Sequence, residues 1–229
     1  MAFPSILQAS TFQKDNANVT TFEVTRPAGL TNDNTLLIIF ATDGDPTIDM
    51  SADGLTHVGS GSNNTVTMRA AYRKIDGTEP TTFTVTTDNV QRACAVAYEI
   101  QDAADPGVDA PTENTTFGTS ATPDPSIHTP AGGAKDFLWV AAVGVDRDRT
   151  IDSFPANMTI GSSQQNVDGG GANSCSIGTD THQVNASSFN PDTFGISASD
   201  GWIALTINIS PAAAAAGPIH LTMAPYIPT

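Results

Sequence analysis

The sequence predicts an all-β fold, namely an antiparallel, jelly-roll-like β-sandwich built from two duplicated halves. Three observations lead to this prediction: the composition, the spacing of short apolar runs, and an internal repeat. Thr, Val, Ser, Asn, Asp, Gly and Pro dominate the chain, and charged residues make up only 14%, a balance that favours short strands joined by turns. No stretch longer than the alanine run at 212–216 is typical of a helix, so we expect few helices.

The repeat places similar segments about a hundred residues apart. Two pairs of markers share an offset of 103 (130 − 27 and 146 − 43), and the closing segments share an offset of 109 (204 − 95). The matching segments are 24–29, 36–40, 43–49 and 95–100 in the first half and 127–132, 139–143, 146–152 and 204–209 in the second. A repeated unit determines the architecture, so we expect two equivalent sets of strands.

Each half is expected to contain short strands separated by Gly, Asp, Asn and Pro. In the first half the strands are expected at 20–25, 35–41, 56–59, 65–75, 81–87 and 92–100. In the second half they are expected at 126–128, 137–145, 158–160, 174–183, 193–197 and 201–209. Alternation over 65–75 predicts a half-buried strand. The runs 36–40 and 138–143 are apolar on both sides, which favours central strands covered on two faces over strands at a subunit interface.

The repeat divides the chain into a body and two arms. The body spans 18–210, with pseudo-repeats 18–102 and 121–210, and two equivalent strand sets most economically form one sandwich with pseudo-twofold symmetry. Two tandem sandwiches joined near 101–109 are the alternative, although each would have a small core. Residues 1–17 and 211–229 do not repeat, so we interpret them as an N-terminal and a C-terminal arm that contact neighbouring molecules or dock on the body.

The charge balance excludes several classes of partner. With 24 acidic and 9 basic residues, a net charge of −15 and scattered Lys and Arg, we expect no nucleic-acid binding.

No apolar run approaches the roughly 20 residues that span a bilayer, and residues 1–8 lack the basic and apolar regions of a signal peptide. We therefore expect neither a membrane partner nor secretion. Cys94 and Cys175 are expected to be buried free thiols.

The repeated Asp-x-Asp-x-Thr-Ile-Asp motif is the strongest candidate for a ligand site. Calcium binds several oxygen ligands, and one loop of this kind could supply them. The candidate ligands are Asp43, Asp45 and Asp49, with Asp53 as a further one, and Asp146, Asp148 and Asp152 in the second copy. The favoured alternative is that these side chains accept hydrogen bonds from backbone amides in a turn after a central strand. Apart from calcium, no cofactor is expected.

The sequence carries no signal of catalysis, so we do not expect an enzyme. It lacks a Gly-x-Ser-x-Gly motif, and neither cysteine lies in the positively charged surroundings that activate a thiol. The four histidines are dispersed without the spacing of metal ligands. Trp139 and Trp202 lie in the most apolar segments, which favours core packing over an exposed platform for sugars.

Several ordered segments carry a resemblance to a known family. They are Pro27-Ala28-Gly29, the apolar run 36–39, the segments 54–59 and 71–74, Asp76-Gly77-Thr78-Glu79-Pro80, and Ala95-Val96-Ala97-Tyr98. In this order they resemble a family of β-sandwich structural proteins of tailed bacteriophages and prophages. The resemblance covers about residues 18–210 and includes Trp202-Ile203-Ala204, although Leu55 stands where the family often has Trp. It implies a virion or tail-associated structural protein, and no catalytic residues carry over.

Two functional hypotheses follow. The first is a bacteriophage virion structural protein on the particle exterior, either a capsid decoration (cement) protein or a tail or fibre component. It would be made in the host bacterial cytoplasm and would act through homo-oligomerisation, with a trimer favoured, and through contacts with major capsid or tail proteins. The second is a carbohydrate-binding receptor-recognition module that binds a host glycan and holds calcium in its Asp-rich loops.

Overall fold

The computed structural model describes residues 2–158, 164–167 and 174–213. This part of the chain consists of antiparallel strands, loops and a short 3₁₀ turn, η1, at Ala52–Gly54. Within these residues, no helix has the length and apolar character needed to cross a membrane. The prediction of an all-β, antiparallel fold is confirmed.

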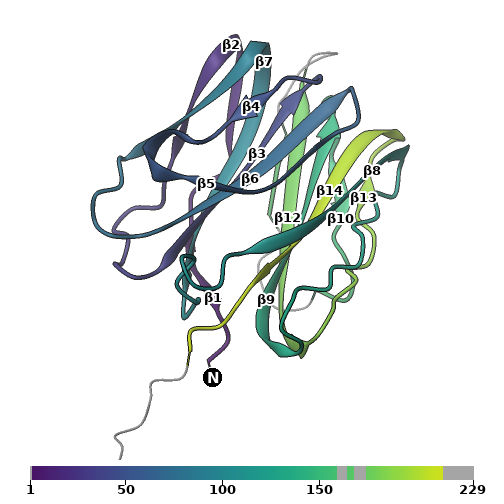
Figure 1. The fold of residues 1–229 in the computed structure, drawn as a ribbon. Coiled ribbons are helices and arrows are strands. Elements are labelled where there is room, and N and C mark those ends of the chain that lie inside the picture. Colours follow the sequence, from purple (N-terminus) through teal and green to yellow (C-terminus); the bar gives the residue numbers. More distant parts are fainter. Residues whose placement is uncertain (1, 159–163, 168–173, 214–229) are drawn as a thin grey trace, which may run out of the picture.

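Two large sheets form the body (Figure 1). The first sheet has the strand order β1-β7-β3-β6-β5, and β2 and β4 also pair with β7. Its strands are β1 (Ser5–Ala9), β2 (Gln13–Thr25), β3 (Thr35–Asp43), β4 (Ile48–Asp49), β5 (Thr56–Ser62), β6 (Val66–Lys74) and β7 (Thr82–Gln101). The second sheet has the order β11-β12-β9-β14-β8, and β10 pairs separately with β13. These strands are β8 (Thr112–Ser120), β9 (Lys135–Asp146), β10 (Ile151–Ser153), β11 (Gln164–Val167), β12 (Cys175–Ala186), β13 (Gly195–Ile196) and β14 (Asp200–Ile209).

The two strand orders correspond to each other strand for strand. Reading β1-β7-β3-β6-β5 beside β8-β14-β9-β12-β11 places the aligned apolar runs on β3 and β9 and the aligned closing segments on β7 and β14. This correspondence supports our interpretation of the halves as two copies of one unit. Each half makes its own sheet, so the sandwich is confirmed while the jelly-roll part of the prediction is not.

Three apolar cores explain why the middle strands are apolar on both sides. Leu37 and Ile39 of β3 lie in the inner core, between the two sheets, together with side chains from the second half. Leu36, Ile38 and Phe40 point the other way, into a first outer core beneath β2, β4 and the beginning of β7. A second outer core covers the far side of β9 and contains Phe137, Trp139 and Phe194. Central strands covered on two faces are thus confirmed, and burial on each face stabilises them by roughly 1.5–3 kcal/mol for each large aliphatic side chain.

Strands 81–87 and 92–100, expected to be separate, form the single strand β7. Its first part, at Thr82–Thr86, pairs with β2, and its second part, from Ala93 to Ile100, pairs with β3. Phe83 and Val85 belong to the first outer core, whereas Val96 and Tyr98 belong to the inner core. The chain therefore passes from the covering layer into the sheet without leaving the extended conformation, although Asp88 and Asn89 are typical of a turn.

Other differences lie at the margins of the sheets. β4, β8, β10 and β11 were not among the expected strands, and 126–128 contributes an isolated bridge between His128 and Phe189 instead of a strand. Of the strand expected at 158–160, residues 159 and 160 lie outside the described residues. The N-terminal segment docks on its own body, because β1 pairs with the end of β7. Of the C-terminal arm, residues 214–229 lie outside the described residues, and Pro211 bridges to Ala103.

Candidate functional site

Two equivalent aspartates of the repeat meet between the sheets. Asp43 ends β3 and Asp146 ends β9, and their side chains share a hydrogen bond. The ends of β3 and β9 can approach each other closely because Gly144, two residues before Asp146, has no side chain. A Cβ at Gly144 would lie 3.0 Å from Met68 Cε and 3.3 Å from the Cβ of Ala41, its own repeat equivalent (144 − 41 = 103). We call Asp43 and Asp146 the carboxyl pair.

Burial makes the carboxyl pair hold a proton. The pKa of Asp146 is raised to about 6, first by burial and then by the negative charges of Asp200 and Asp43, while Arg147 opposes the rise. The pKa of Asp43 is also raised by burial, against the hydrogen bond to Asp146 and the charges of Arg92 and Arg147. Two carboxylates in contact disfavour double ionisation, so below about pH 6 Asp146 carries the proton and can donate it to the Asp43 carboxylate.

An ion pair fixes the third carboxylate, Asp200, beside the carboxyl pair. Arg149 Nε and Nη2 both lie 2.7 Å from Asp200 Oδ2, and the other Asp200 oxygen accepts the Gly201 amide at 3.0 Å. Arg147 lies farther away, with 3.8 Å between its Nε and Asp146 Oδ2. This arrangement anchors the ends of β3 and β9 and the start of β14.

The remaining aspartates of the motif do not join this group. Asp45, Asp49, Asp148 and Asp152 are exposed. Asp49 Oδ1 accepts the Ser51 amide at 2.8 Å, and this bond lowers the pKa of Asp49, as expected for a carboxylate that stabilises a turn. Among the described residues, no three Asp, Glu, His or Cys side chains are grouped to hold a metal ion. The structure brings together one aspartate from each loop, and calcium binding stays a prediction.

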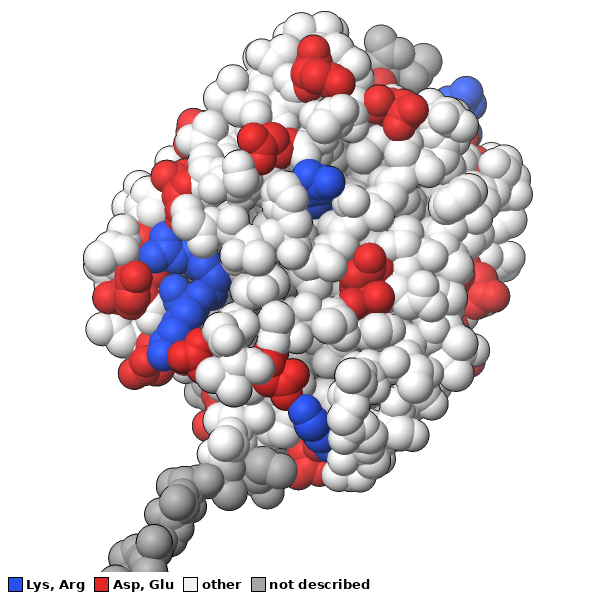
Figure 2. Space-filling view, in the orientation of Figure 1, with Lys and Arg blue, Asp and Glu red and all other residues white. Residues whose placement is uncertain are grey.

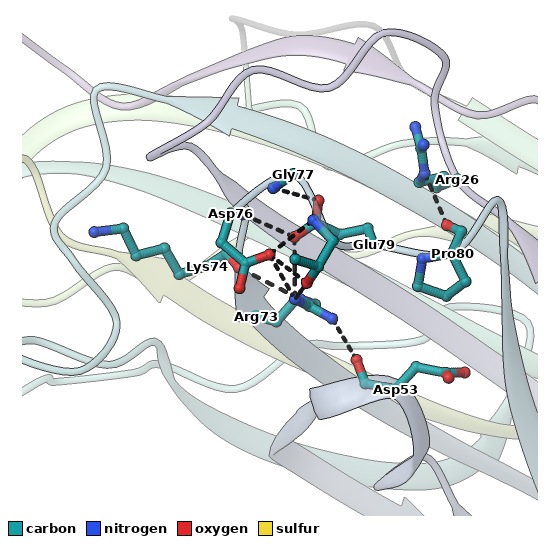
Figure 3. Close-up of polar contacts among 9 residues, drawn as sticks. Arg26, Asp53, Arg73, Lys74, Asp76, Gly77, Glu79 and Pro80 are labelled. Atoms are coloured by element: carbon teal, nitrogen blue, oxygen red, sulfur yellow. Dashed lines mark hydrogen bonds and ion pairs between the residues drawn. The ribbon is translucent and has the colours of Figure 1, made fainter.

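A second polar cluster closes the loop after β6 (Figure 3). Arg73 Nη2 lies 3.1 Å from Oε1 of Glu79, whose side chain is only 2% exposed. The Glu79 carboxylate also accepts the backbone amides of Asp76 and Gly77 at 2.8 and 3.1 Å, and Arg73 donates to the Asp53 carbonyl. The Arg-Lys-x-Asp-Gly-Thr-Glu segment that contributed to the family resemblance is therefore a turn held by a buried ion pair.

The fully buried Glu99 organises one side of the first sheet, a structural role that the sequence did not reveal. Its carboxylate accepts the Thr31 amide at 2.8 Å and Asn34 Nδ2 at 2.7 Å, and it also bonds the Gln8 side chain of β1. Burial alone would raise the pKa of Glu99, but these hydrogen bonds outweigh it, and the pKa is lowered.

The repeat equivalent of Glu99 is Asn208 (208 − 99 = 109). Asn208 bonds Thr112 of β8 at 2.5 Å and His128 at 2.9 Å. The same position thus ties the first strand of each half to its sheet. The offset of 109 is the sequence signal that could have identified this role.

The remaining candidates serve the packing. Trp139 and Trp202 are buried in the second outer core, which confirms their expected role. Cys94 and Cys175 are buried and outside any disulfide, as expected. The Cys94 Sγ lies 3.1 Å from the Cys175 carbonyl oxygen, so the two residues meet across the inner core.

Comparisons of the chain with protein-family models, curated proteins and solved structures find no match. The resemblance to phage β-sandwich proteins therefore stays a prediction from the sequence.

Proposed function

We propose that the chain is a structural protein on the exterior of a bacteriophage particle, acting through protein–protein contacts as a capsid decoration protein or as a tail or fibre component. The family resemblance supports this setting. Two sheets packed around one inner core form a single body, and acidic residues are scattered over its mostly uncharged surface (Figure 2).

The observation that carries the proposal is the use of buried charge. Glu79 holds a loop through two backbone amides and Arg73, and Glu99 holds another loop and β1. Asp200 holds the start of β14 through Arg149 and the Gly201 amide. Buried charges are stable only when they are paired and hydrogen-bonded, and here the partners are structural groups. These buried carboxylates therefore stabilise the fold.

Quantitative mass spectrometry of purified particles tests this function. We expect peptides of the chain in particles of the phage or induced prophage that encodes it, in a fixed ratio to the major capsid protein. Hundreds of copies would indicate capsid decoration, and a few to a few dozen would indicate a tail, fibre or vertex component. Absence from purified particles would refute the proposal.

A second candidate function is glycan binding, favoured by one surface hollow. This hollow has a volume of about 510 Å³ and is lined by Phe154 together with Asp124, Ser153, Asn190, Asp192 and Thr193. Carboxylate, amide and hydroxyl groups beside an aromatic ring suit the hydroxyls and apolar faces of a sugar. A glycan array with the Asp192→Asn protein as control, repeated with a chelator, tests this candidate; an array without a hit would count against it.

A further inference from the structure

We propose that two copies of this chain associate by pairing their β8 strands edge to edge. This inference deepens the proposed function, because it names a surface through which the protein would assemble. β8 is the last strand of the second sheet and pairs with β14 on one side. In Figure 1, β8 lies at the front of the molecule with its outer edge toward the viewer. Such an edge presents unpaired backbone N–H and C=O groups to another strand.

Among the described edge strands of the two sheets, β8 is the longest without a register shift, since the longer β2 has shifts between Asp15 and Thr21. It spans nine residues and follows β14 from Thr112 to Ser120 without a register shift. β1 has five residues and a register shift beside Leu7, β5 has a shift between His57 and Gly59, and β11 has four residues. Short or bulged edges resist pairing with another chain. The segment Thr-Glu-Asn-Thr-Thr-Phe-Gly-Thr-Ser of β8 contains neither Lys nor Pro, the residues that commonly protect an edge.

Exposed apolar side chains flank the β8 edge. Phe117 lies opposite Ile203 on the side of the inner core but is 63% exposed. Ile127, which is 52% exposed, lies beside the opposite face of β8. There the Asn114 side chain donates a hydrogen bond to the Ile127 carbonyl at 2.7 Å. An aromatic ring at a protein interface commonly contributes much of the binding energy.

Charge favours a second copy as the occupant of this edge. The whole chain carries a net charge of −15, so most faces of two copies repel each other. Figure 2 shows mostly uncharged residues over β8, with an acidic side chain near the middle of the strand. Glu113, the charged residue of the strand, is half-buried beneath β5: a Cβ at Gly59 would lie 2.2 Å from Glu113 Cγ. Self-association is therefore least opposed by charge along β8.

The β8 sequence is compatible with antiparallel pairing to itself. With Thr116 opposite Thr116 of the second copy, Phe117 stands opposite Thr115 and Glu113 stands opposite Thr119. This register sets an aromatic side chain against a β-branched one, which is a favourable cross-strand pair, and opposes no like charges. The contact is twofold and joins the two second sheets into one. It predicts a dimer, whereas the sequence analysis favoured a trimer.

The test is the molar mass of the purified full chain, measured by light scattering after size exclusion over a dilution series. We expect a dimer that dissociates on dilution, and Phe117→Lys should weaken it roughly 30-fold, as for loss of a central aromatic residue in an interface. Val108→Lys, at a site 87% exposed in the loop before β8, is the matched control and should leave the dimer intact. Equal thermal unfolding temperatures of the two variants would show that Phe117→Lys still folds.

Hydrogen exchange of the β8 amides that point away from β14 gives the second readout, because the amides bonded to β14 stay protected in a monomer as well. We expect the outward-pointing amides to lose protection as the protein is diluted. A wild-type monomer at every concentration, a trimer, or a dimer that Phe117→Lys leaves unchanged would overturn the proposal. A monomer whose outward-pointing β8 amides stay protected at all dilutions would overturn it in favour of coverage of this edge within the same chain. These results do not depend on virions: a β8 dimer absent from purified particles would refute only the proposed function.

Discussion

Replacing Asp146 by asparagine should remove a pH dependence of stability that the carboxyl pair creates. The pKa of Asp146 is about 6 in the folded protein against an ordinary value of 3.8, so the folded state binds this proton more tightly than the unfolded chain does. The corresponding stabilisation is fully present below about pH 4 and is lost as the pH rises through about 6. Above this range, ionised Asp146 lies buried beside Asp43 and Asp200.

The pKa difference sets the expected size of the effect. At about 1.4 kcal/mol for each unit of pKa, the rise from 3.8 to about 6 corresponds to roughly 3 kcal/mol. An asparagine at position 146 stays neutral at every pH, and its amide can donate to Asp43 as the protonated acid does. The Asp146→Asn protein should match wild type near pH 4 and exceed its stability by about 3 kcal/mol at pH 8. For a chain of this length, that difference raises the unfolding temperature by about 6–12 °C.

Urea unfolding at a series of pH values measures this difference directly. Asp148→Asn is the matched control, because it removes one exposed charge from the same loop, and it should not reproduce the pH-dependent gain in stability of Asp146→Asn. Because other groups titrate in both proteins, the difference between the Asp146→Asn and wild-type free energies of unfolding is the quantity to plot. Parallel curves for these two proteins from pH 4 to 8 would refute the shared proton.

Three further outcomes follow from the packing and the ion pairs. Glu79→Ala leaves Arg73 and two backbone amides without their acceptor, and should lower the free energy of unfolding by about 3 kcal/mol in urea titrations. A change within about 0.5 kcal/mol would contradict a stabilising role for the Glu79 carboxylate. Gly144→Val overfills the contact between the sheets and should cost about 1–3 kcal/mol, with the urea midpoint as readout. Cys94 and Cys175 should react with a thiol reagent only as fast as the protein unfolds, so rapid labelling of native protein would show that they are accessible.

The fold could be predicted as far as side-chain patterns report burial. Runs such as 36–40 are apolar at every position because two cores lie against the strand, and this pattern identified β3 and β9. β8 escaped prediction because an edge strand is partly wet on both faces, and its Thr and Asn residues give no alternation. β7 was divided in two because Asp88 and Asn89 are typical of turns, whereas pairing with β2 and β3 keeps the chain extended on either side of them.

The candidate site was predictable in its residues but not in its contacts. The offset of 103 identified Asp43 and Asp146 as equivalents. Whether these two aspartates touch depends on how the two sheets stack, which the sequence does not report. The sequence therefore suggested ligands gathered within each loop, whereas the structure pairs the first aspartate of one loop with the first of the other. Glu99 was missed for a similar reason, since its partners come from β1 and the loop at 31–34.

The division of the inner core between the two halves has a consequence during synthesis. The first sheet is complete once Gln101 has left the ribosome, but the side chains that cover Leu37, Ile39 and Val96 reach as far as Ile209. At translation rates of about 5–20 residues per second, roughly 5–20 s separate these two moments. Throughout that interval the nascent chain exposes an apolar sheet face with no covering layer. Chaperones bind surfaces of this kind, and neighbouring nascent chains on a polysome can contact them as well.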